Sequence, residues 1–212
     1  MSISENIRKI KNSIPKDITL VAVSKTKPIS DIRIAYDSGH KIFGENRVQE
    51  LVEKYEQLPQ DIEWHMIGHL QRNKVKYIAP FVSLIHSIDS IKLLEEVNKR
   101  AKLNNRTIDC LIQVHIATES SKFGFLSSEI KHAILESSKL ENINIIGLMG
   151  MASFTNNNNQ IEKEFLFLKS IFKKNQNDLS VLSIGMSGDY KIAINCGSNM
   201  IRVGSVIFGN RN

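Results

Sequence analysis

The chain has 212 residues, of which 42% are hydrophobic and 24% charged, as in globular proteins that bury a core without disulfide or metal staples. No apolar run approaches the length that crosses a bilayer, and the start, MSISENIRKIKNSIP, has no apolar stretch behind basic residues, so we expect no membrane span and no signal peptide. The net charge is +6, but the lysines are scattered without interleaved aromatics, so we expect no nucleic-acid partner.

Eight strand-like apolar runs alternate with amphipathic helical windows along the chain. The predicted strands are 18–24, 41–44, 63–68, 82–87, 108–116, 143–149, 179–185 and 200–204. The predicted helices are 2–13, 29–38, 46–57, about 71–78, 90–104, 127–138, 158–176 and 188–196. We expect the first of these helices to cover the barrel wall where a helix after the eighth strand is missing.

The strand patterns favour an α/β fold with parallel strands. LVAV, LIQVHI and INIIGLM are apolar on both faces, which is typical of parallel strands covered by helices. Eight β/α units predict a single (β/α)8 TIM-type barrel with an extra N-terminal helix, and we expect residues 1–212 to form one domain. A doubly wound open sheet is the alternative, but SKTKP stands where its glycine fingerprint would follow the first strand. Cys110 and Cys196 lie far apart without a CxxC motif, so we expect reduced, buried thiols and a cytoplasmic protein.

Glycine and hydroxyl residues follow the last two strands, at the face where barrels of this kind carry their active sites. Gly185 ends the seventh strand and Ser187 follows two positions later, and Arg202, Gly204 and Ser205 lie at the end of the eighth. These loops are the usual phosphate site of the fold, because backbone amides and hydroxyls meet an anion there. The alternative is that the glycines serve turns and Ser187 caps a helix. Two such sites on adjacent strands, with an arginine beside one, favour phosphate.

Two lysines end the first strand, which neighbours the eighth in a closed barrel. A lysine at the barrel mouth near a phosphate could form a Schiff base with an aldehyde cofactor, and desolvation would lower its pKa. If Val21 and Val23 point out to the helices, Lys25 sits where the strand breaks into the loop, and periodicity does not separate it from Lys27. We expect Pro28 to start the next helix and Lys27 to be the more exposed lysine.

Other polar residues near the strand ends have less specific roles. His65 and His69 are four apart, but they span a strand and a loop without the glutamate of a zinc helix, so we expect no metal. We expect His65 to be satisfied internally and His69 to lie at the barrel mouth. Glu45 is either a base or a structural hydrogen-bonding residue, and Trp64 is predicted to lie in the core.

Eight motifs follow one another in the order found in a known protein family, and together they span about residues 18–209. They are AVSKTKP, FGENRVQE, WHMIGHLQRNK, HSIDS, SSKFG, GLMGM, SIGMSGDYKIAI and IRVGSVIFG. Together they closely resemble the family of small pyridoxal 5′-phosphate (PLP) homeostasis proteins, which are similar to the barrel domain of alanine racemase without its second domain. The resemblance implies PLP as the cofactor, a role in vitamin B6 balance and PLP-dependent apoenzymes as partners. We expect a monomer.

The resemblance also implies roles for individual residues. It implies that Lys25 carries PLP as a Schiff base and that Asn46 lies near the ring. The phosphate would be held by Ser187, Arg202, Gly204 and Ser205, with Arg202 facing either the phosphate or the ring nitrogen. The chain departs from the family pattern at Lys191, Asn199, Ser205 and Phe123. Ser205 keeps a hydroxyl, and Lys122 is a candidate for a second cofactor contact, although a solvated loop lysine fits better.

Two functions remain, a carrier of PLP and an amino-acid racemase. Racemisation on this fold needs two bases, and the resemblance places the second, a tyrosine, in a further domain. All four tyrosines here, Tyr36, Tyr55, Tyr77 and Tyr190, fall in predicted helices. We therefore favour a carrier that buffers PLP and supplies apoenzymes without turnover of its own; an RNA-binding role would rest on charge alone.

Overall fold

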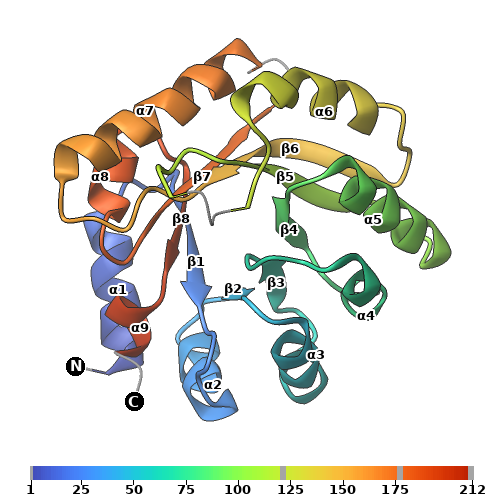
Figure 1. Ribbon diagram of the computed structural model, residues 1–212. Coiled ribbons are helices and arrows are strands. Elements are labelled where there is room, and N and C mark those ends of the chain that lie inside the picture. Colours follow the sequence, from blue (N-terminus) through green and yellow to red (C-terminus); the bar gives the residue numbers. More distant parts are fainter. Residues whose placement is uncertain (1, 120–122, 176–178, 210–212) are drawn as a thin grey trace.

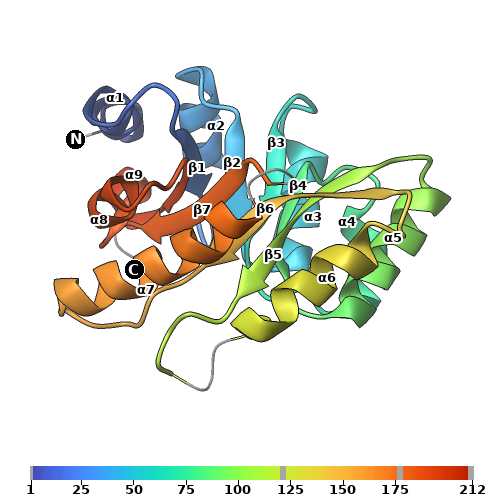
Figure 2. The same cartoon turned by 90° about the horizontal axis from the view of Figure 1, so that it is seen from above.

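The computed structural model describes residues 2–119, 123–175 and 179–209, and its eight parallel strands close into a barrel (Figures 1 and 2). The strands are β1 (Thr19–Val23), β2 (Ile42–Glu45), β3 (Glu63–Met66), β4 (Leu84–Ile88), β5 (Ile108–Val114), β6 (Ile143–Gly150), β7 (Val181–Met186) and β8 (Met200–Val203). Each strand pairs with its sequence neighbours, and β1 closes the barrel by pairing with β8. The predicted TIM-type barrel is confirmed.

Helices follow the strands and form the outer layer (Figure 1). They are α1 (Ile3–Ser13), α2 (Ile29–Asp37), α3 (Val48–Gln57), α4 (Val75–Ile78) after the 3-10 turn η1 (Arg72–Lys74), α5 (Ile91–Leu103), α6 (Ile130–Ser137) after η2 (Ser127–Glu129), α7 (Asn158–Lys174), α8 (Tyr190–Asn195) and α9 (Ser205–Phe208). None of the helices in these ranges is both long and apolar enough to cross a membrane.

The wall after β8 has its own short helix, so the expectation that no helix follows the eighth strand was wrong. The four residues of α9 are too few to show a helical period in the sequence. Helix α1 lies beside α9 (Figure 1). The Asn6 side chain donates a hydrogen bond of 2.9 Å to the Ile207 carbonyl. The N-terminal helix and the C-terminal turn therefore cover this part of the barrel together.

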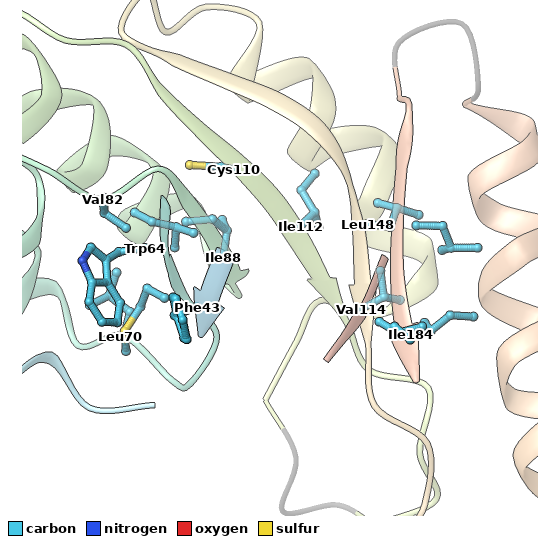
Figure 3. Packing of buried hydrophobic residues seen from close by; sticks show 14 of the residues in the cluster. Phe43, Trp64, Leu70, Val82, Ile88, Cys110, Ile112, Val114, Leu148 and Ile184 are labelled. Atoms are coloured by element: carbon cyan, nitrogen blue, oxygen red, sulfur yellow. The ribbon is translucent and has the colours of Figure 1, made fainter. Parts of the chain in front are cut away.

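The main core lies between the barrel and its helices (Figure 3). Trp64 and Phe43 are fully buried there with ring centroids 5.8 Å apart, as predicted for the single tryptophan. Cys110 and Cys196 are buried and unpaired, as the spacing of the cysteines predicts. Removing Trp64 to alanine would cost about 3–5 kcal/mol of unfolding free energy, the range for large core aromatics.

A second apolar cluster fills the barrel itself and shows which way β1 faces. Val21 packs inside with residues of four other strands, Leu84, Leu111, Met149 and Met200, whereas Ala22 belongs to the outer core. The assumed orientation, with Val21 and Val23 facing the helices, was therefore wrong. Since side chains alternate along a strand, Val23 faces the same way as Val21. β1 ends at Val23, and Lys25 follows two residues later, just beyond the end of the strand.

Candidate cofactor site

A cavity of about 590 Å³ opens at the C-terminal ends of the strands, a volume typical of small-molecule sites. It is lined by all six residues predicted for the cofactor: Lys25, Asn46, Ser187, Arg202, Gly204 and Ser205. It is also lined by Lys27, the other lysine after the first strand, and by residues that the sequence did not single out: Val23, Ile67, Met151, Phe154, Met186, Gly188 and Gly209. The structure thus brings the loops after β1, β2, β7 and β8 to one site.

The two lysines after β1 occupy different environments within one turn. The backbone amide of Lys27 donates to the Ser24 carbonyl at 3.0 Å, so Lys25 is the second residue of a tight turn. The ammonium group of Lys27 donates to the Phe208 carbonyl at 3.0 Å, at the end of α9. Lys27 and Lys25 are both half-buried, so the expectation that Lys27 is the more exposed of the two stays a prediction. Lys27 has a structural partner that explains its place.

Asn46 follows β2 and presents a buried acceptor. Its Oδ1 atom is inaccessible to solvent and has no hydrogen-bond partner among the described residues. Gly68, which follows β3, lies directly against the Asn46 backbone, and a Cβ at this glycine would stand 2.3 Å from the Asn46 carbonyl oxygen. Only glycine fits there without moving Asn46, a contact that the sequence could not reveal. Asn46 as a whole is half-buried and lines the cavity, so other atoms of the residue are within reach of a ligand.

The loops after β7 and β8 are joined by a hydrogen bond. The Gly204 amide donates to Ser187 Oγ at 3.0 Å, and a Cβ at Gly204 would lie 3.2 Å from the Val23 carbonyl oxygen. Ser187 is not a helix cap, because Asp189 is the residue that precedes α8. A Cβ at Gly188 would meet nothing within 4 Å, so the backbone is open to the cavity there. Hydroxyls and accessible glycine backbone suit an anionic oxygen group.

Gly185 serves the turn and not the cavity. Its φ of 97° lies in the left-handed region, and an added Cβ would stand 2.6 Å from Cβ of Ala193 on α8. The alternative considered for the glycines, a strand-to-helix turn, therefore holds at Gly185.

Arg202 forms part of the cavity floor and is held from within the barrel. Its guanidinium donates to the Ser183 carbonyl at 2.7 Å, to Ser183 Oγ at 2.6 Å and to the Gly150 carbonyl at 3.0 Å. Arg202 is 3% exposed and forms no ion pair with any described residue. Burial lowers the pKa of Arg202 to about 10, so it stays charged at neutral pH. A buried cation whose hydrogen bonds go to two carbonyls and a hydroxyl favours an electron-rich group in the cavity.

Two neutral histidines extend the contacts of Arg202 across the barrel. Ser183 Oγ lies 3.1 Å from His86 Nδ1, and His86 Nε2 lies 3.1 Å from His65 Nδ1. Burial lowers the pKa of His65 to about 3 and that of His86 well below its ordinary value. His65 is thus satisfied internally, as predicted, while His69 bonds Asp89 at 3.0 Å.

The remaining sequence candidates fall outside the cavity. Glu45 lies behind the barrel wall, where it is bonded to Ser24 and Lys54, so its structural role is the one the geometry supports. The exposed Phe123 stacks on His69 with centroids 3.8 Å apart. Lys122 lies outside the described residues.

The chain matches the family described as the alanine racemase N-terminal domain over residues 1–212. A pyridoxal phosphate homeostasis protein of Aquifex aeolicus is 40% identical over 197 residues, which cover 91% of this chain and 86% of the relative. The chain belongs to the pyridoxal phosphate homeostasis protein family. Another member, from Schizosaccharomyces pombe, is 36% identical over 202 residues, covering 92% of this chain and 85% of the relative.

The fold is similar to solved structures of two kinds of protein. PipY of Synechococcus elongatus, solved with PLP bound, has a TM-score of 0.90 and 31% identity, covering 98% of this chain and all of PipY. Alanine racemase of Clostridium difficile has a TM-score of 0.82 at 15% identity, covering 99% of this chain and 57% of the racemase. The second likeness shows the fold alone.

Proposed function

We propose that this chain binds PLP in the cavity as a Schiff base on Lys25 and serves PLP and vitamin B6 homeostasis as a carrier. The observation that carries the proposal is that Lys25, the hydroxyls of Ser187 and Ser205, and the buried cation of Arg202 line one cavity. PLP brings an aldehyde, a phosphate and a pyridine nitrogen, which match these groups in turn. The PLP-bound relative PipY supports the same assignment.

Each end of the cofactor has a matching set of residues in the proposal. Ser187, Gly204 and Ser205 would hold the phosphate, with Gly204 kept near β1 by its close approach to Val23. Asn46 would contact the ring from its place in the cavity lining. Arg202 is tied to carbonyls of β6 and β7 inside the barrel, which favours the ring side over the phosphate loops.

The contacts of the cavity favour a carrier over a racemase. A racemase needs a second base opposite the lysine, and the four tyrosines lie on α2, α3, α4 and α8, outside the lining of the cavity as the described residues define it. The ammonium group of Lys27, the second amine at the cavity, donates a hydrogen bond to the Phe208 carbonyl. We propose that residues 1–212 act as one PLP-binding domain, monomeric and cytoplasmic, which passes its cofactor to apoenzymes.

Borohydride reduction tests the covalent link. The protein mixed with PLP should show an imine absorbance, and reduction should fix the cofactor onto the peptide that contains Lys25. Lys25→Ala should abolish the adduct, and the matched Lys27→Ala should retain it. An adduct that survives Lys25→Ala and is lost in Lys27→Ala would overturn the assignment.

Transfer and turnover separate the carrier from its rival. The loaded protein should activate a PLP-dependent apoenzyme, and it should show no stereospecific turnover of the common amino acids. Robust racemase or transaminase activity that depends on Lys25 would favour the enzyme.

A further inference from the structure

The turn that carries Lys25 has an unfavourable backbone conformation. Its third residue, Thr26, has a φ of 64°, in the left-handed region that glycine adopts easily and β-branched residues disfavour. Among the described residues other than glycine, only Thr26 and Asn105 have positive φ, and asparagine tolerates it. A strained residue next to a reactive one persists only where its surroundings hold it.

Charged side chains hold this turn from behind the barrel wall. The ammonium of Lys54 donates to the Ser24 carbonyl at 2.7 Å, and the Thr26 amide donates to Glu50 Oε1 at 2.5 Å. The hydroxyl of Ser24 donates to Glu45 Oε1 at 2.6 Å. The backbone is therefore bound by a charged group on each side of Lys25.

The same side chains bind one another beneath α3. The ammonium of Lys54 lies 2.6 Å from Glu45 Oε1 and 2.7 Å from Glu50 Oε1, with only 5% of the Lys54 side chain exposed. We call Ser24, Glu45, Glu50 and Lys54 the clamp. Burying such ions is commonly no better for stability than packing hydrophobic residues in their place. Stability alone does not account for the clamp, whereas a fixed turn geometry does.

We propose that the clamp is a positioning device that aims Lys25 into the cavity for reaction with the aldehyde of PLP. The inference rests on the proposed function and adds residues that do not touch the cofactor. In the reaction, the neutral amine of Lys25 adds to the aldehyde carbon, the C=N bond forms and water leaves. Fixing the backbone at Ser24 and Thr26 leaves only the lysine side chain to be ordered, which raises the rate of this step.

Stopped-flow mixing of the apoprotein with PLP measures that rate directly. Lys54→Met and Glu50→Ala should each slow growth of the imine absorbance by about tenfold or more, since small misplacements of reacting groups are costly. Glu53→Ala, an exposed glutamate on the same helix, should react at the wild-type rate. Binding of pyridoxine 5′-phosphate, which lacks the aldehyde, should stay within about twofold of wild type in all of them, because the clamp leaves ring and phosphate contacts intact.

Thr26→Gly separates positioning from stability. Glycine adopts this φ without strain but also adopts other conformations freely, so the melting temperature should be maintained while the turn loosens and imine formation slows. If Lys54→Met does not fold, the rates of imine formation in Thr26→Gly and Glu50→Ala still test the proposal. Folded clamp variants that react at the wild-type rate would refute the positioning role, as would equal losses of aldehyde reaction and pyridoxine 5′-phosphate binding. If wild-type protein traps no PLP on Lys25, the proposed function itself fails and the clamp proposal with it.

Discussion

Ser187 Oγ accepts a hydrogen bond of 3.0 Å from the backbone amide of Gly204, and this bond joins the loops after β7 and β8. Ser187→Ala removes the acceptor and leaves the amide unpaired, which typically costs about 1–3 kcal/mol. We expect PLP affinity to fall by about fivefold or more, measured by fluorescence titration. Ser187→Thr, which keeps the hydroxyl, should bind within about threefold of wild type. Unchanged affinity in Ser187→Ala would contradict a phosphate role for this loop.

Substitutions of Arg202 and Ser187 should weaken the binding of different parts of the ligand. Ser187→Ala should weaken PLP but not pyridoxal, which lacks the phosphate. Arg202→Met should weaken both ligands, since the guanidinium is held inside the barrel by Ser183 and Gly150. Equilibrium titration of the two variants with both ligands checks this. Loss of PLP binding alone in Arg202→Met would place the arginine at the phosphate.

Gly68 should be sensitive to a single methyl group. A Cβ there would stand 2.3 Å from the Asn46 carbonyl oxygen, so Gly68→Ala must displace the backbone of Asn46. We expect weaker PLP binding by about tenfold, because overpacking of this kind commonly costs about 1–3 kcal/mol. Gly39→Ala is the control for a methyl added away from the cavity, since its Cβ would meet nothing within 4 Å and Gly39 precedes β2, at the opposite end of that strand from Asn46. Equal affinities of Gly68→Ala and wild type would show that Asn46 need not be held in place.

His40 should make the protein less stable in mild acid. It precedes β2, at the opposite end of that strand from Asn46, and burial lowers its pKa to about 4, with the charge of Lys11 adding to the effect. Below pH 6.5 His40 binds a proton in the unfolded state but stays neutral in the folded state. The free energy of unfolding therefore falls as the pH falls, down to about pH 4. The contribution lost between pH 7 and pH 5 is about 2 kcal/mol.

His40→Gln should therefore reduce the pH dependence of stability by about that amount, measured by urea unfolding at both pH values. His132→Gln, a substitution of an exposed histidine on α6, should leave the pH dependence as it is in wild type. The same slope in all three proteins would refute the contribution of His40.

Much of the fold was predictable from the sequence because parallel strands buried on both faces leave long apolar runs. All eight strands and the larger helices appear within a few residues of their predicted positions. The orientation of β1 was not predictable for the same reason. Val21 and Ala22 are both apolar, so alternation carries no information about which of them faces the barrel interior.

The candidate site was predictable to the extent that it depends on strand ends. Those ends converge in a closed barrel, so residues at them share one cavity wherever the strands are correctly placed. Gly68 was missed because its importance lies in a contact with a neighbouring loop. Lys54 was missed because a lysine in a helix is ordinarily solvated, although its spacing from Leu51 puts it on the buried face of α3.

The pairing of β1 with β8 has a consequence for how the molecule is made. Lys25 leaves the ribosome well before Gly204 and Ser205, which follow β8. The cavity is complete only after these segments meet. Contacts between residues so far apart in the sequence form slowly during folding. A nascent chain that has not yet reached β8 therefore has the Lys25 amine without the phosphate loops beside it.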